Sequence, residues 1–68
     1  MPKGWHVTFP EGNRVRVFKV GIADQDEAVR AATKGRAVEG LAVLPLKDSE
    51  FEQLAMKEGQ IIESGQIN

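Results

Sequence analysis

The run from Ala37 to Leu46 is the most apolar stretch of the chain and places the strongest constraint on its fold. It holds a single charge, Glu39, in ten residues, which is typical of a strand that is buried on both faces. Pro45 has no backbone N–H to donate, so we expect pairing to stop there or to continue only at a sheet edge. A predicted helix lies on each side of this run, which favours a small α/β or α+β unit with the run at its centre.

Two segments before this run alternate apolar and polar residues, as half-buried strands do. In residues 5–9 the odd positions are apolar and the even positions are polar. Residues 10–13 supply a turn and alternation resumes from Arg14, which predicts an antiparallel hairpin. The pattern leaves open whether Trp5 and Phe9 are core residues or exposed ones.

The second strand changes its apolar face near Phe18. Val15 and Val17 share one face, whereas Phe18 and Val20 fall on the other. This change predicts either a bulge near Phe18 and Lys19 or a strand that passes from half-covered to covered on both faces, and we favour the second.

The first helix is predicted from its two ends. Asp24 followed by Glu27 is a variant of the capping box, and Gly35 suits the residue after the last turn. The face that this helix would bury is thin and consists of Ala28, Val29 and Ala32.

The second helix follows the apolar run. Ser49 and Glu52 form a capping box, with Asp48 as the alternative cap, and Gly59 ends the helix. Residues 60–63 then predict a short strand at a sheet edge.

These elements predict the order β-β-α-β-α-β and the α+β class. We expect a small two-layer sandwich, with an N-terminal hairpin and both helices on one face of a mixed sheet. Residues 1–68 form a single domain with ends that fray near 1–3 and 64–68. The order of the strands in the sheet is not predicted. The predicted core consists of Val7, Val20, Leu41, Val43, Phe51 and Leu54.

The composition argues against most kinds of active site. The chain has no cysteine and one histidine, which excludes disulfides, thiolate metal sites and imidazole clusters. No phosphate-binding glycine loop is present, so we expect a protein that is not an enzyme and uses no cofactor. A catalyst built on Pro2 or His6 is a third alternative, but the pattern offers neither residue a partner. The chain has no transmembrane run or signal peptide, which predicts a cytoplasmic protein without membrane contact.

Charge is unevenly spread along the chain. Residues 1–36 hold seven basic and four acidic side chains, whereas residues 37–68 hold two basic and six acidic ones. Such asymmetry is found in proteins with a nucleic-acid face and in dimers with complementary surfaces. It also arises from two solvated faces with no binding role.

We therefore expect an interaction module that binds a protein partner or a second copy of itself. A core this small is marginally stable, and a second subunit is the one stabilising device that the composition leaves available. The alternative is a small nucleic-acid-binding module that uses the basic hairpin, with Trp5 and Phe9 as stacking platforms. A net charge of −1 argues against that alternative. The expected interaction surface consists of Arg14, Arg16, Lys19, Ile61 and Ile62.

Overall fold

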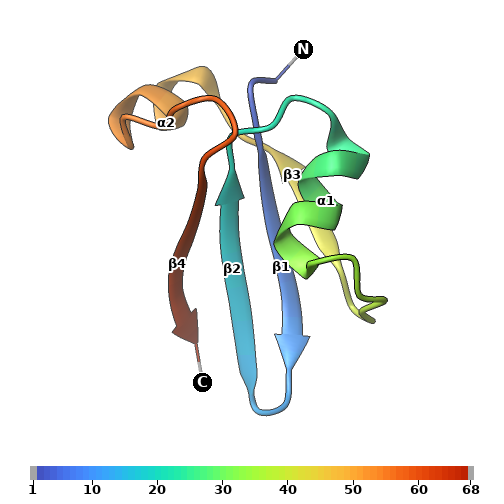
Figure 1. Cartoon of the computed structure of the whole chain (residues 1–68). Helices are drawn as coiled ribbons and strands as arrows, with labels where there is room; N and C mark the ends of the chain where they lie inside the picture. Colours follow the sequence, from blue (N-terminus) through green and yellow to red (C-terminus); the bar gives the residue numbers. More distant parts are fainter. Residues whose placement is uncertain (1, 68) are drawn as a thin grey trace.

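Four strands and two helices follow one another in the predicted order, which confirms the α+β class (Figure 1). The computed structural model describes residues 2–67. The fraying expected at residues 1 and 68 lies outside this range. The elements are β1 (Trp5–Glu11), β2 (Arg14–Val20), α1 (Gln25–Thr33), β3 (Ala42–Pro45), α2 (Asp48–Gln53) and β4 (Ile61–Ile67).

The β1–β2 hairpin occupies the centre of the sheet, whose strand order is β3-β1-β2-β4. Each pair of neighbouring strands is antiparallel, so the mixed sheet that we predicted is wrong. After β2 the chain returns along α1 and enters β3 in the direction of β2. The two strands are not neighbours because β1, the hairpin partner of β2, lies between them.

The apolar run is not the centre of the sheet. Only Ala42–Pro45 form a strand, β3, and it lies at an edge. Leu41 is 38% exposed and Leu44 is 61% exposed. The run is limited at one end by Gly40, which has a positive φ of 72°, and at the other by Pro45. Two seven-residue strands joined by a tight turn can pair locally, and they occupy the centre instead.

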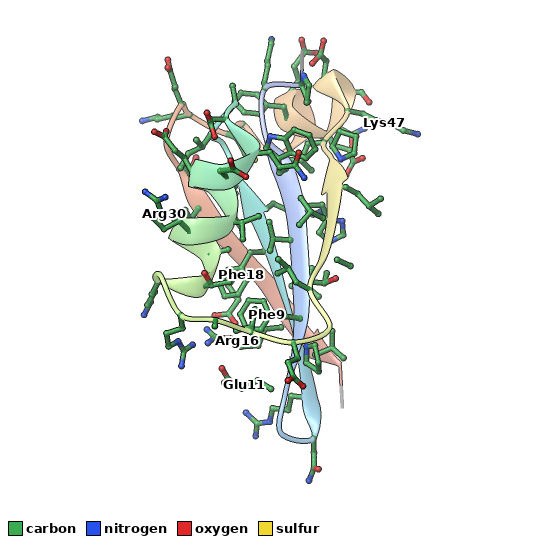
Figure 2. The ribbon with its side chains drawn as sticks, turned by 90° about the vertical axis from the view of Figure 1, so that its right-hand side faces the viewer. Phe9, Glu11, Arg16, Phe18, Arg30 and Lys47 are labelled. Atoms are coloured by element: carbon green, nitrogen blue, oxygen red, sulfur yellow. The ribbon has the colours of Figure 1, made fainter. Side chains whose placement is uncertain are left out.

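The core lies between the hairpin and α1. Phe9 and Phe18 stack with their ring centres 5.6 Å apart, and Figure 2 shows them side by side beneath α1. Phe9 is buried and Trp5 is half-buried against the same cluster, where its Nε1 donates a hydrogen bond to the Ala23 carbonyl oxygen. The buried cluster consists of Val7, Phe9, Phe18, Val20, Ala28 and Ala32.

The predicted core is confirmed only in part. Val7 and Val20 are fully buried. Val43, Phe51 and Leu54 are half-buried, and Leu41 is exposed.

The caps of α1 are as predicted. The Asp24 carboxylate accepts a hydrogen bond from the Glu27 amide at 3.1 Å. Lys34 adopts a left-handed conformation, and the Gly35 amide donates to the Arg30 carbonyl oxygen at 3.0 Å. The thin buried face is also confirmed, since Ala28 and Ala32 are buried.

The predicted caps of α2 are wrong. The helix begins at Asp48 with Lys47 as N-cap, and no side chain makes a capping hydrogen bond. It ends at Gln53, well before Gly59. Instead of covering the same face as α1, α2 lies at the end of the sheet away from the hairpin turn, above the start of β4 (Figure 1). The segment after it is held there because the Gly21 amide donates to the Gln60 carbonyl oxygen at 2.7 Å.

Strand β4 is longer than predicted and continues through residues that we expected to fray. Its pairing with β2 shifts register between Arg16 and Phe18, whereas the pairing of β2 with β1 is regular. The irregularity therefore belongs to the β2–β4 pair. The start of β2 is half-covered as we predicted, since Val15 is 38% exposed. The passage to cover on both faces that we favoured is wrong, because neither helix lies over the side of β2 that carries Val17 and Lys19 (Figure 2). The structure supports the bulge instead.

Candidate interaction surface

The face of the sheet opposite α1 is not covered by a helix. Side chains of paired residues in an antiparallel sheet point to the same face. One row across all four strands runs from Leu44 through His6 and Lys19 to Ile62. Seen side-on, α1 lies on one side of the sheet only (Figure 2). We call this surface the open face. Its described residues are His6, Thr8, Pro10, Val15, Val17, Lys19, Ala42, Leu44 and Ile62.

The open face is apolar and carries little charge. Leu44 and Val15 are exposed, and Val17 and Ile62 are half-buried. Lys19 is its only permanently charged group among the described side chains. An apolar surface depleted of charge resembles the centre of a protein–protein interface.

The two edges of the sheet differ in their protection. β3 has four residues and ends in Pro45, and both features discourage the addition of a further strand. β4 has seven residues, no proline and a single charge, Glu63. No described strand pairs with the outer side of β4. In the part of β4 that the structure describes, the register shift against β2 is the one irregularity that would hinder pairing at this edge.

The charge of Glu63 is directed towards the α1 side, where it belongs to an ion-pair cluster. Arg16 Nε donates to Glu63 Oε2 at 2.9 Å, and Arg16 Nη1 lies 3.4 Å from Glu11 Oε2. Arg36 Nη2 approaches the same Glu11 oxygen at 3.5 Å. The Arg16 guanidinium also stacks over the Phe18 ring at 4.9 Å from its centre. This cluster closes the hairpin end of the core (Figure 2).

The hydrogen bond between Arg16 and Glu63 shifts both titrations. It raises the pKa of Arg16 and lowers the pKa of Glu63, with the charge attraction acting in the same direction. Both groups therefore stay ionised around neutral pH, and Arg16 stabilises the fold through its ion pairs with Glu63 and Glu11.

The five predicted surface residues are divided between the two faces. Lys19 and Ile62 are paired neighbours on the open face. Arg14, Arg16 and Ile61 share the α1 side, where Ile61 is 42% exposed. Their pairing partners fix this division, because Ile61 pairs with Val20 of the core.

Sequence reasoning missed the two large apolar residues of the open face that are exposed, Leu44 and Val15. Leu44 was hidden by the interpretation of the apolar run as a buried strand. Pro45 was the signal that could have found it, since a strand that ends in proline is typical of an edge. Val15 was placed in the half-covered part of its strand, and its alternation with Arg14 and Arg16 does not tell which face α1 covers.

Other features of the structure offer little for chemistry. A pocket of about 350 Å³ at the α2 end is lined by Lys3, Ala23, Phe51 and Glu58, with Lys3 Nζ lying 5.7 Å from the centre of the Phe51 ring. His6 Nε2 is buried without a hydrogen-bond partner. Within residues 2–67 there is no group of three potential His, Cys, Asp or Glu metal ligands, and no helix is long and apolar enough to cross a membrane.

Comparison with known protein families, characterised proteins and solved structures finds no match to this chain. The surface of the molecule is therefore the basis for a proposal about its function.

Proposed function

We propose that this chain is a non-enzymatic protein-interaction module that acts in the cytoplasm without a cofactor. The observation that carries the proposal is the open face, where Leu44 is 61% exposed and Val15 is 38% exposed with no helix over them. Burying apolar surface contributes about 25 cal/mol per Å², so a second polypeptide on this face gains from the contact. The unprotected β4 edge adjoins the same face and extends the binding surface.

Nucleic-acid binding by the hairpin has less support. Phe9 is 1% exposed and stacks on Phe18, so its ring is not accessible to a base. Arg16 is engaged by Glu11 and Glu63. An electrostatic footprint for phosphates needs cations that are not neutralised by neighbouring carboxylates.

Site-specific photocrosslinking in the cells that encode this chain tests the proposal. A photoreactive amino acid replaces Val15 on the open face in one variant and Gln25, exposed on α1, in the matched control. We expect a discrete protein adduct from position 15 and none from position 25. The crosslinked protein is then identified by mass spectrometry, produced in pure form and titrated with the chain.

Binding of the purified partner should be lost in Val17→Lys, which places a charge at the centre of the open face. A second copy of this chain counts as a partner in the crosslinking experiment. The absence of adducts at position 15, or equal adducts at both positions, would overturn the proposal.

A further inference from the structure

We infer that the partner is a second copy of this chain, bound by antiparallel pairing of β4 with β4 of the copy. This inference rests on the proposed function and specifies its partner. Two features of the molecule support it independently: the unequal protection of the sheet edges and the distribution of charge along the strands.

The unequal protection of the two sheet edges explains why association through β4 stops at two copies. In a two-fold arrangement β4 pairs with itself, and the combined sheet has the order β3-β1-β2-β4-β4-β2-β1-β3. Its two free edges are both β3, the short strand that ends in Pro45. The β4 edge is therefore paired in the dimer, and the two β3 edges that remain free resist further pairing.

Charge is separated along the direction of the strands. The first half, which we call the α2 half, contains residues 2–4, the start of α1, α2, residues 54–60 and the ends of the strands near them. The second, the hairpin half, contains the turn of the hairpin, the ion-pair cluster, the last turn of α1 and residues 34–41 (Figure 1). Figure 2 shows Lys47 and Glu11 at opposite ends. The α2 half holds seven acidic and four basic residues. Its acidic residues are Asp24, Asp26, Glu27, Asp48, Glu50, Glu52 and Glu58.

The hairpin half has the opposite balance, with five basic and three acidic residues. The basic residues are Arg14, Arg16, Arg30, Lys34 and Arg36. The acidic residues are Glu11, Glu39 and Glu63.

These charges select the direction of pairing. In antiparallel pairing of β4 with its copy, the two molecules are related by a rotation of half a turn. The α2 half of each molecule therefore lies beside the hairpin half of the other. Parallel pairing would place acidic beside acidic and basic beside basic. Opposite charges that face one another across an interface fix orientation and penalise the alternative.

Apolar residues of β4 also gain cover in this arrangement. Ile61 is 42% exposed on the α1 side, and Ile62 is half-buried on the open face. Both lie at the edge, where the neighbouring strand of the copy would contact them. The two open faces then form one continuous surface.

Sedimentation equilibrium with paired variants tests the interface. Ile62→Lys and its matched control Leu41→Lys add the same charge in place of an aliphatic side chain, at opposite edges of the sheet, and Leu41 lies outside the open face. We expect the wild type and Leu41→Lys to dimerise and Ile62→Lys to remain monomeric. Ile61→Lys, at a more exposed position, serves as a second interface variant, and circular dichroism checks that each variant folds.

The direction of pairing is tested by fluorescence energy transfer. The chain has no cysteine, so Asn13→Cys in the hairpin turn and Ser49→Cys on α2 each provide a unique labelling site. Antiparallel pairing predicts that a donor at position 49 transfers more efficiently to an acceptor at position 13 of the copy than to one at position 49. Raising NaCl from low to high concentration should weaken dimerisation by about tenfold, as expected for a few exposed ion pairs.

The outcomes separate this inference from the proposed function. A monomer at millimolar concentration, equal dimerisation of Ile62→Lys and wild type, or more efficient transfer between two labels at position 49 would overturn the inference. A different protein crosslinked at position 15 would leave the proposed function standing in each of these cases. The loss of both crosslinks and dimers would overturn both.

Discussion

Phe9 is the largest fully buried side chain in the core between the hairpin and α1. Its ring is 1% exposed and stacks on Phe18 with an interplanar angle of 17°. Phe18 is in turn covered by the Arg16 guanidinium, so one buried ring supports the next and the ion-pair cluster beyond it. A change at Phe9 should therefore disturb both the core and the charges that close it.

We predict that Phe9→Ala lowers the free energy of unfolding by about 3–5 kcal/mol, the usual cost of truncating a buried phenylalanine. The total stability of a domain this size is roughly 3–10 kcal/mol, so this variant should be largely unfolded or close to it. Leu41→Ala is the control and should cost less than about 1 kcal/mol, because Leu41 is 38% exposed. Urea denaturation followed by tryptophan fluorescence measures both. Equal losses would contradict the position of the core.

Glu63 should make part of the stability depend on pH. Its pKa is lowered in the folded chain by the hydrogen bond from Arg16, so the unfolded chain binds a proton more readily. The stabilising contribution is complete above the unfolded pKa and is lost as pH falls through the folded pKa.

We predict that stability falls as pH decreases below about 4.5 and that Glu63→Gln makes this decrease shallower. The pKa of Arg16 is raised, so this arginine contributes no change in the same pH range. Urea denaturation at a series of acidic pH values provides the measurement. If the free energy of unfolding fell with pH at the same rate in the wild type and in Glu63→Gln, the ion pair would contribute nothing to the pH dependence of stability.

At the scale of elements, the sequence predicted what depends on neighbours in the chain and failed where distant segments compete. The caps of α1 follow from Asp24 and Gly35, which act on backbone within one turn, and both are confirmed. The position of β3 depends on which strand pairs with β1, a choice among distant segments that no local pattern encodes. The apolar run was therefore recognised as a strand but assigned to the wrong place in the sheet.

The two helices allow a direct comparison of a cap that forms with one that does not. Asp24→Ala should lower the free energy of unfolding by about 1 kcal/mol, because it removes the acceptor for the Glu27 amide. Ser49→Ala should change it by less than about 0.5 kcal/mol, since no side chain caps α2. Thermal unfolding monitored by circular dichroism distinguishes the two. A large loss in Ser49→Ala would mean that the capping box forms in solution.

At the scale of the whole molecule, the candidate surface could be predicted only in part. Ile61 and Ile62 were expected at an edge strand on opposite faces, and they lie there. The predicted two-layer sandwich implied one uncovered face of the sheet, but the residues that form this face could not be predicted, because they depend on the strand order and on the side that α1 covers. The grouping of charges into two halves likewise requires the path of the chain, since α1 contributes its acidic first turn to one half and its last turn to the other.

The hairpin half carries a net positive charge, which also suits an acidic ligand. We predict no binding of single- or double-stranded oligonucleotides at low salt, measured by fluorescence anisotropy. Each described cation of the ion-pair cluster contacts Glu11 or Glu63, and the aromatic rings beneath are buried. A phosphate backbone would have to displace these carboxylates before any counterion release could drive association. Micromolar binding that weakens with salt and disappears in Arg14→Ala with Arg16→Ala would contradict this view. Lys47→Ala, in the α2 half, is the control that should leave such binding unchanged.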